Sequence, residues 1–190
     1  MQEVSLYNET LDKKDYTHTP LPKGEYENCT FSNCDFSGSS LAGSKFIECI
    51  FNSCNLSLAR LNKTIVRDVQ FKDCKMLGLR FDTCGGLSLL FSFDNCQLNH
   101  SSFYNTKVAQ TVFKNCRLNE VDFTSANLSD AVFDNCNLLS ATFDSTILER
   151  ADFRTAYNYI INPQANNIRK ASFSLSGVPG LLHEFDIEIE

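Results

Sequence analysis

Residues 93–138 read FDNCQLNHSSFYNTKVAQTVFKNCRLNEVDFTSANLSDAVFDNCNL, and a large apolar residue recurs at every fifth position from Phe93 to Leu138. A period of five matches neither the 3.6 residues of a helical turn nor the two of a flat strand. The same register runs through the N-terminal half of the chain, from Leu6 to Phe81. An internal repeat of this length decides the fold before any local pattern does.

The register is interrupted once. It slips by two residues within Cys84 to Phe93, around Gly85 and Gly86, and then continues to Phe153. Fourteen of the sixteen phenylalanines of the chain lie on it, counting Phe173, which follows Phe153 by twenty residues. We therefore treat the two halves as one repeat with an insertion between them.

The position of each large apolar residue is here called the large slot, and the position two residues before it the small slot. All nine cysteines fall in small slots, whose other occupants are mostly Ser, Thr and Ala. One large and one small inward residue per five fit a chain that turns a corner every five residues, so that four sides make a coil of 20 residues.

Coils stacked at the β spacing of about 4.8 Å would build a ladder of rings beside a column of thiols. The predicted core ladder is Phe31, Phe51, Phe71, Phe93, Phe113, Phe133 and Phe153, and Phe173 continues it. The predicted small-slot ladder is Cys34, Cys54, Cys74, Cys96, Cys116 and Cys136.

Segments such as NCDFS at 33–37, SANLS at 125–129, NCNLL at 135–139 and RADFR at 150–154 resemble the unit A-(D/N)-L-x-x of the pentapeptide repeat family. The resemblance covers residues 24–155, with Cys often in the Ala position and Phe often in the Leu position. It implies an all-β fold, a right-handed quadrilateral β-helix of roughly B-DNA width. The spacing alone predicts a square solenoid without a handedness.

We expect the β-helix to span residues 24–175, with the slip near 85–92. Residues 1–23 are predicted to form an irregular first coil or N-terminal cap, because their small slots hold Glu9 and Lys14. Residues 176–190 are predicted to form a C-terminal tail, with a helical turn and then a strand, since 184–190 alternate acidic and apolar residues. The tail either covers the last coil or joins a second copy in a homodimer, as in related pentapeptide proteins, through Leu181, Leu182, Phe185, Ile187 and Ile189.

Composition and motifs exclude several function classes. The net charge of −6 over 190 residues excludes a chain-wide basic footprint for direct nucleic acid binding. No apolar run is long enough for a membrane span, and the N-terminus shows no signal peptide, so a cytoplasmic protein is expected.

We expect the cysteines to be reduced thiols without disulfides, because stacked parallel strands hold Cβ atoms too far apart. Metal ligation is not expected either, since successive small slots lie on adjacent walls. No catalytic motif surrounds the three histidines, and a rod filled with Phe and Leu offers no concave pocket. The sequence therefore predicts no cofactor and no enzyme activity.

Charge is uneven along the chain. Residues 60–80 carry a local charge of +4, from Arg60, Lys63, Arg67, Lys72, Lys75 and Arg80 against Asp68 and Asp73. Residues 118–152 carry −6, and their acidic residues form the candidate partner surface: Glu120, Asp122, Asp130, Asp134, Asp144, Glu149 and Asp152. Arg150 is the single basic residue in that segment.

Two functions remain open. Residues 26–51, YENCTFSNCDFSGSSLAGSKFIECIF, resemble the quinolone-resistance branch of the family, although the long loops of many of its members are missing. That resemblance implies a DNA mimic that binds DNA gyrase or topoisomerase IV and confers quinolone protection. The alternative is a structural scaffold, a protein-binding solenoid with an unrelated partner, because one fold hosts many functions.

Overall fold

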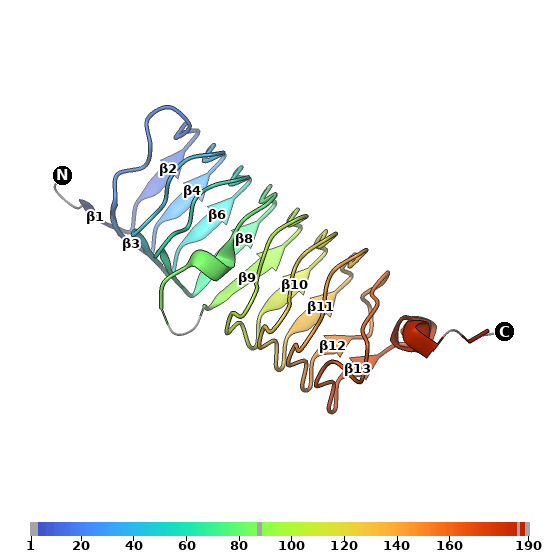
Figure 1. The fold of residues 1–190 in the computed structure, drawn as a ribbon. Helices are drawn as coiled ribbons and strands as arrows, with labels where there is room; N and C mark the ends of the chain where they lie inside the picture. The colour runs from blue at the N-terminus through green and yellow to red at the C-terminus, as the bar shows by residue number, and fades with distance from the viewer. Residues whose placement is uncertain (1–3, 87–88, 186, 189–190) are drawn as a thin grey trace.

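The chain winds into a rod in the computed structural model, which describes residues 4–86, 89–185 and 187–188 (Figure 1). The rod is a right-handed quadrilateral β-helix of about eight turns with one short helix at its C-terminal end. Every strand pair is parallel, and paired residues are 20 apart except where β8 (Val69–Lys72) meets β9 (Phe91–Asp94), where they are 22 apart. The predicted fold and the two-residue slip are confirmed.

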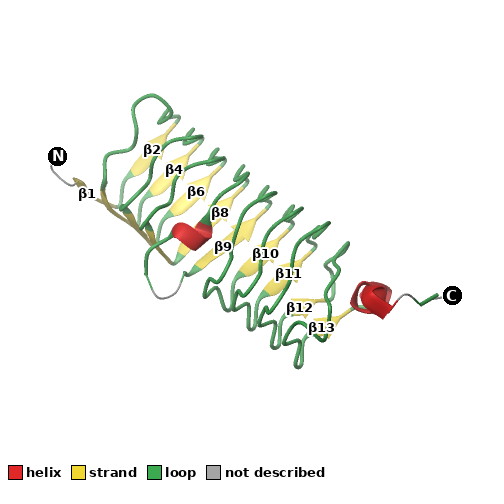
Figure 2. Cartoon of the chain, in the orientation of Figure 1, coloured by secondary structure: helices red, strands yellow, loops and turns green. Residues whose placement is uncertain are grey.

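Four faces follow one another along each coil, and two of them carry regular strands (Figure 2). Face 1 holds a nine-stranded sheet: β2 (Thr10–Asp12), β4 (Thr30–Ser32), β6 (Ile50–Asn52), β8, β9, β10 (Val112–Lys114), β11 (Val132–Asp134), β12 (Asp152–Phe153) and β13 (Ser172–Phe173). Faces 2 and 3 are joined by single bridges between coils, such as Gln97 to Arg117 on face 2 and Ser102 to Asp122 on face 3. Face 4 holds the four-stranded sheet: β1 (Val4–Tyr7), β3 (Gly24–Glu27), β5 (Lys45–Ile47) and β7 (Ile65–Arg67).

The predicted ladder of phenylalanine rings fills the rod on face 1. Successive rings from Phe31 to Phe173 stack with centroids 4.6–5.3 Å apart. A second stack on face 3 runs from Phe81 to Phe143, and its rings meet those of face 1 edge to face. Offset stacks and edge contacts are the arrangements that aromatic rings favour, so the two columns lock the interior.

The small slots carry donors that face the backbone of the coil before. The Cys54 thiol lies 3.3 Å from the Phe31 carbonyl oxygen, and the Cys136 thiol lies 3.3 Å from that of Phe113. Thr146 takes the same place with its hydroxyl, 2.9 Å from the Phe123 carbonyl oxygen. Cys, Ser and Thr therefore share this slot because each is small and offers a donor to a buried carbonyl.

The corners depend on a backbone conformation with positive φ, which cannot be recognised from the side chains at those positions. At nearly every corner the residue two positions after the large slot has a positive φ, such as 54° at Asn33, 60° at His100 and 58° at Leu58. Gly and Asn adopt this left-handed region readily, whereas other residues pay about 1–2 kcal/mol for it. Corners with bulky residues are therefore strained points of the rod.

Replacing Leu58 with asparagine is expected to raise the free energy of unfolding by about 1 kcal/mol, because Asn tolerates the positive φ. Leu58 is 68% exposed, so little packing is lost. Leu139→Asn is the matched control, since Leu139 is 51% exposed but its φ is not positive. Urea denaturation measures both, and an equal change in the two variants would show that corner strain is not relieved.

The C-terminal tail differs from the predicted strand. After η2 (Leu175–Gly177) and α1 (Pro179–Leu182), the chain continues into the 3₁₀ turn η3 (His183–Phe185), and residues 187 and 188 are not in a strand. An alternating segment forms a strand only beside a free sheet edge, and the backbone leaves α1 with helical angles at His183 instead. The strand expectation is wrong over 184–185, and Asp186, Ile189 and Glu190 lie outside the described residues.

Candidate interaction surface

A segment of 20 residues passes once around the whole rod, so neighbours in sequence lie on different faces. In the coil 111–130 the large slots Phe113, Leu118, Phe123 and Leu128 belong to faces 1, 2, 3 and 4 in turn. The basic segment 60–80 therefore forms a ring around the rod rather than a patch. A one-sided patch needs like charges every 20 residues.

The seven candidate acidic residues are spread in the same way. Asp134 and Asp152 lie on face 1, Asp122 and Asp144 on face 3, and Glu149 on face 4. Glu120 and Asp130 occupy corners, at positions with positive φ. The structure thus pairs acids on face 1 and on face 3, and it places Asp130 and Glu149 around one arginine, Arg150. The acids are distributed around the C-terminal half and do not form one patch.

Four of these carboxylates have a partner close by. The Arg150 guanidinium donates to Asp130 at 2.7 and 2.8 Å and to Glu149 at 2.7 Å. Arg154, two residues beyond the segment considered from sequence, donates to Asp152 at 2.7 Å, and His100 lies 3.3 Å from Glu120.

The hydrogen bonds from Arg150 lower the pKa of Asp130, and those from Arg154 lower the pKa of Asp152. The three remaining acids, Asp122, Asp134 and Asp144, accept only hydrogen bonds from neutral donors in the described part of the chain.

The candidate cap or dimer residues lie at the C-terminal end of the rod. Leu181 packs against the core, and Leu182 is half-buried. Phe185 and Ile187 are about half exposed, while Ile189 lies outside the described residues. The end of the rod therefore presents apolar side chains beside a covered last coil.

The thiols are free and shielded. Burial raises the pKa of the Cys49 thiol to about 11 and that of Cys84 to about 12, which keeps both protonated at neutral pH. Across residues 4–86, 89–185 and 187–188, no group of three or more His, Cys, Asp or Glu side chains is placed to hold a metal ion. In that same part of the chain, no helix is long and apolar enough to cross a membrane.

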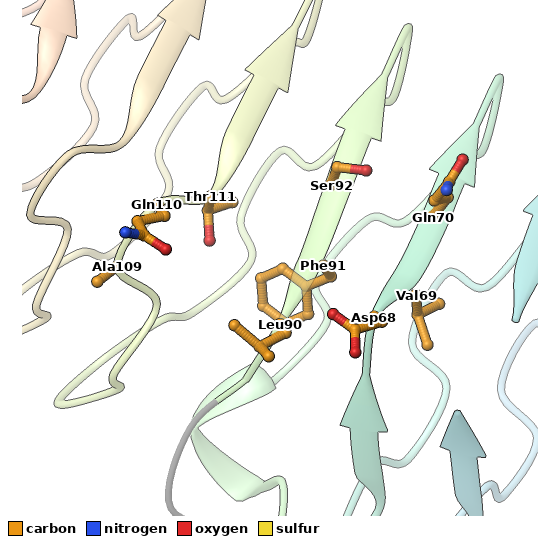
Figure 3. A pocket seen from close by; sticks show the side chains of 9 residues that line it. All are labelled: Asp68, Val69, Gln70, Leu90, Phe91, Ser92, Ala109, Gln110 and Thr111. Atoms are coloured by element: carbon orange, nitrogen blue, oxygen red, sulfur yellow. The ribbon is translucent and has the colours of Figure 1, made fainter. Parts of the chain in front are cut away.

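Several open grooves mark the surface of the described residues, and two of them lie near features discussed above. One, of about 350 Å³, lies between Tyr157–Tyr159 and the start of α1. Another, of about 270 Å³, lies at the corner between faces 4 and 1, next to the slip, and is lined by Asp68, Leu90 and Gln110 among others (Figure 3). The sequence reasoning missed this second groove. The sequence signal for it is Leu89-Leu90-Phe91. Other coils place two outward residues between a large slot and the next small slot, whereas only Leu90 lies between Leu89 and Phe91.

A family model described as a pentapeptide repeat region matches residues 25–91 and 89–157. A search of curated proteins found no match.

Among solved structures, the chain is similar to HetL, a pentapeptide repeat protein involved in heterocyst differentiation regulation from the cyanobacterium Nostoc sp. strain PCC 7120. The two share 16% identity over 92% of this chain and 88% of that chain, with a TM-score of 0.59. A trypsin-treated variant of QnrB1, a plasmid-mediated fluoroquinolone resistance protein, matches at 20% identity over 99% of this chain and 98% of that chain, with a TM-score of 0.49.

Proposed function

Because this chain belongs to the pentapeptide repeat family, we propose that it is a non-enzymatic protein-binding rod that occupies the DNA channel of DNA gyrase or topoisomerase IV. The observation that carries the proposal is the filled interior, where stacked rings run from Phe31 to Phe173. With its core closed, the rod has only its outer walls and ends for function. The resemblance of residues 26–51 to the quinolone-resistance branch supports the choice of partner.

The placement of the acids fits a partner that surrounds the rod. A channel that binds DNA surrounds its ligand, so its walls can contact negative charges on faces 1, 3 and 4 at the same time. We assign the main contacts with basic residues of the channel to Asp122, Asp134 and Asp144, whose carboxylates accept hydrogen bonds only from neutral donors among the described residues. Such contacts are expected to weaken steeply as the salt concentration rises.

A gyrase supercoiling assay, run with and without a quinolone, tests this function. We expect micromolar protein to inhibit supercoiling or to protect gyrase from the drug. The triple variant Asp122→Asn, Asp134→Asn, Asp144→Asn is expected to lose most of that effect, because it removes three charges without touching the core. Neither inhibition nor protection by the unmodified chain at micromolar concentration would refute the proposal.

A scaffold with an unrelated partner is the second candidate. The ring of basic residues at 60–80 favours it, since a uniform DNA mimic has no place for that charge. A pull-down at rising ionic strength separates the two: a partner held by apolar wall residues stays bound when salt releases an electrostatic one.

A homodimer through the C-terminal end belongs to the same proposal. Partly exposed Phe185 and Ile187 offer apolar surface there. Sedimentation of the full chain and of a chain lacking residues 181–190 checks it, and a full chain that sediments as one copy contradicts it. A cytoplasmic location, where buried thiols stay reduced, completes the proposal.

A further inference from the structure

The corner between faces 4 and 1 is one residue short at the slip. In an uninterrupted coil two outward residues separate a large slot from the next small slot, as Arg67 and Asp68 separate Val66 from Val69. In the following coil Leu89 fills the large slot and Phe91 the small slot, with only Leu90 between them.

The hydrogen bonds fix these assignments. The Leu89 N–H donates to the Lys107 carbonyl at 3.1 Å, just as the N–H of Val108 donates to the Asn127 carbonyl at 3.0 Å one coil later. The strands β8 and β9 pair Val69 with Phe91. The two-residue slip is therefore three residues gained between Cys84 and Leu89 and one lost at the corner.

At intact corners, the N–H of the second outward residue donates to the carbonyl of the first outward residue in the next coil. Glu48 donates to Arg67 at 2.9 Å, and Gln110 donates to Ser129 at 2.8 Å. This bond closes the corner and satisfies both backbone groups.

The short corner leaves two such groups without partners. The carbonyl of Leu90 accepts from Val69 at 3.1 Å instead of from Asp68. As a result, the Asp68 N–H finds no acceptor among the described residues, and the Ala109 carbonyl, which the missing residue would have bonded, finds no donor among them. The corresponding N–H and carbonyl groups are hydrogen-bonded at other corners, whereas here the Asp68 N–H and the Ala109 carbonyl are available to a ligand.

The place of the missing residue is the groove of about 270 Å³ (Figure 3). Asp68 stands on one side, Ala109 and Gln110 stand on the other, and Leu90 and Phe91 lie between them. Asp68 is exposed and makes no ion pair with any described residue, and the same holds for Glu48 one coil earlier on this corner. The groove thus combines a free carboxylate, an unpaired carbonyl and an apolar floor.

We infer that this groove binds the side chain of an arginine presented by a protein partner. A guanidinium donates in several directions within one plane, so it can reach the Asp68 carboxylate and the Ala109 carbonyl together. Its methylene stem packs on Leu90. This inference rests on the proposed function only in that the rod binds protein.

Titration of the ¹⁵N-labelled full chain with the tripeptide acetyl-Gly-Arg-Gly-amide tests it. We expect saturable shifts of the amide signals of Asp68, Leu90 and Gln110, with a dissociation constant of about 1 mM or somewhat above, as a single side-chain contact allows. The citrulline tripeptide has the same shape without the charge and is expected to bind at least about fivefold more weakly. No saturable shift, or equal binding of both peptides, overturns the inference.

Two variants localise the contact. Asp68→Asn removes the charge and keeps a residue that tolerates the φ of 54° found there, and about a fivefold loss of arginine binding is expected. Glu48→Gln removes an equal charge one coil away and is expected to change binding less than twofold. Equal losses in both variants would mean that the general negative potential of this corner attracts the peptide and that the groove does not bind it specifically. That result would overturn the inference.

Inserting an asparagine between Leu90 and Phe91 restores a two-residue corner and is expected to abolish binding, while an otherwise unchanged amide spectrum verifies the fold. The peptide titration needs no gyrase. A chain that fails the supercoiling assay but binds arginine through Asp68 refutes the partner proposed above and leaves this inference supported.

Discussion

Replacing Phe113 with alanine is expected to lower the free energy of unfolding by about 3–5 kcal/mol, the usual loss for a buried Phe. Its ring has no exposed surface and stacks between Phe93 at 5.1 Å and Phe133 at 5.0 Å. Phe103 and Phe123 meet it edge to face. The resulting cavity is hard to close, because backbone hydrogen bonds hold the coils on either side at a fixed spacing.

Urea denaturation followed by circular dichroism measures this loss. Val112→Ala is the matched control, since Val112 is the outward neighbour in the same strand and is 39% exposed. We expect the control to lose less than about 1 kcal/mol. A Phe113→Ala variant that unfolds at the same urea concentration as the control would show that the ring column does not stabilise the rod.

Replacing Gly180 with alanine is expected to detach α1 from the last coil. An added Cβ would overlap the backbone oxygen of Tyr159, and backbone cannot swing aside as a side chain can. Gly180 also accepts a hydrogen bond from the Ile161 N–H at 3.0 Å, so its displacement opens the last coil. A loss of about 1–3 kcal/mol is expected from the overpacking.

The rate of hydrogen exchange at the Ile161 amide measures whether its hydrogen bond to Gly180 has opened. In the unmodified chain its hydrogen bond to Gly180 slows exchange, and the variant is expected to exchange faster there while the amide of Phe113 is unaffected. Leu175→Ala is the control, because Leu175 is 89% exposed. Unchanged protection of Ile161 in the Gly180→Ala variant would contradict the proposed docking of α1.

The interior was predictable from sequence because size and polarity alone define it. A large residue every fifth position and a small one two positions earlier place the ring column and the thiol column without knowledge of the backbone. The slip was visible for the same reason, since it shifts both slots together.

The corners were not predictable, because their conformation depends on φ and not on residue type. Asn33, Leu58 and Lys63 share a positive φ, although their side chains have nothing in common. The loss of one corner residue next to Leu90 was likewise hidden within the net slip of two. The distribution of the candidate acidic residues around the rod was hidden for a geometric reason: summing charge over 118–152 adds residues that face different directions.

The strand predicted in the C-terminal tail is absent from the described residues 184–185 and 187–188 for a third reason. Alternation in residues 184–190 describes what a strand there would bury, but a strand also needs a neighbouring edge, and sequence does not supply one. Pro179 at the first turn of α1 favours helical entry instead.

The coil of 20 residues also limits how the gene for such a protein can vary. Whole coils can be duplicated or deleted, and each change lengthens or shortens the rod by one strand spacing while the ring column continues unbroken. Shorter insertions are tolerated only where the chain between two strands bulges outward, as in the 22-residue step between β8 and β9, where three residues are gained on face 4 and one is lost at the corner. Small insertions and deletions therefore alter the outline of the rod and leave its ring column in place, which lets related chains acquire different binding sites on one scaffold.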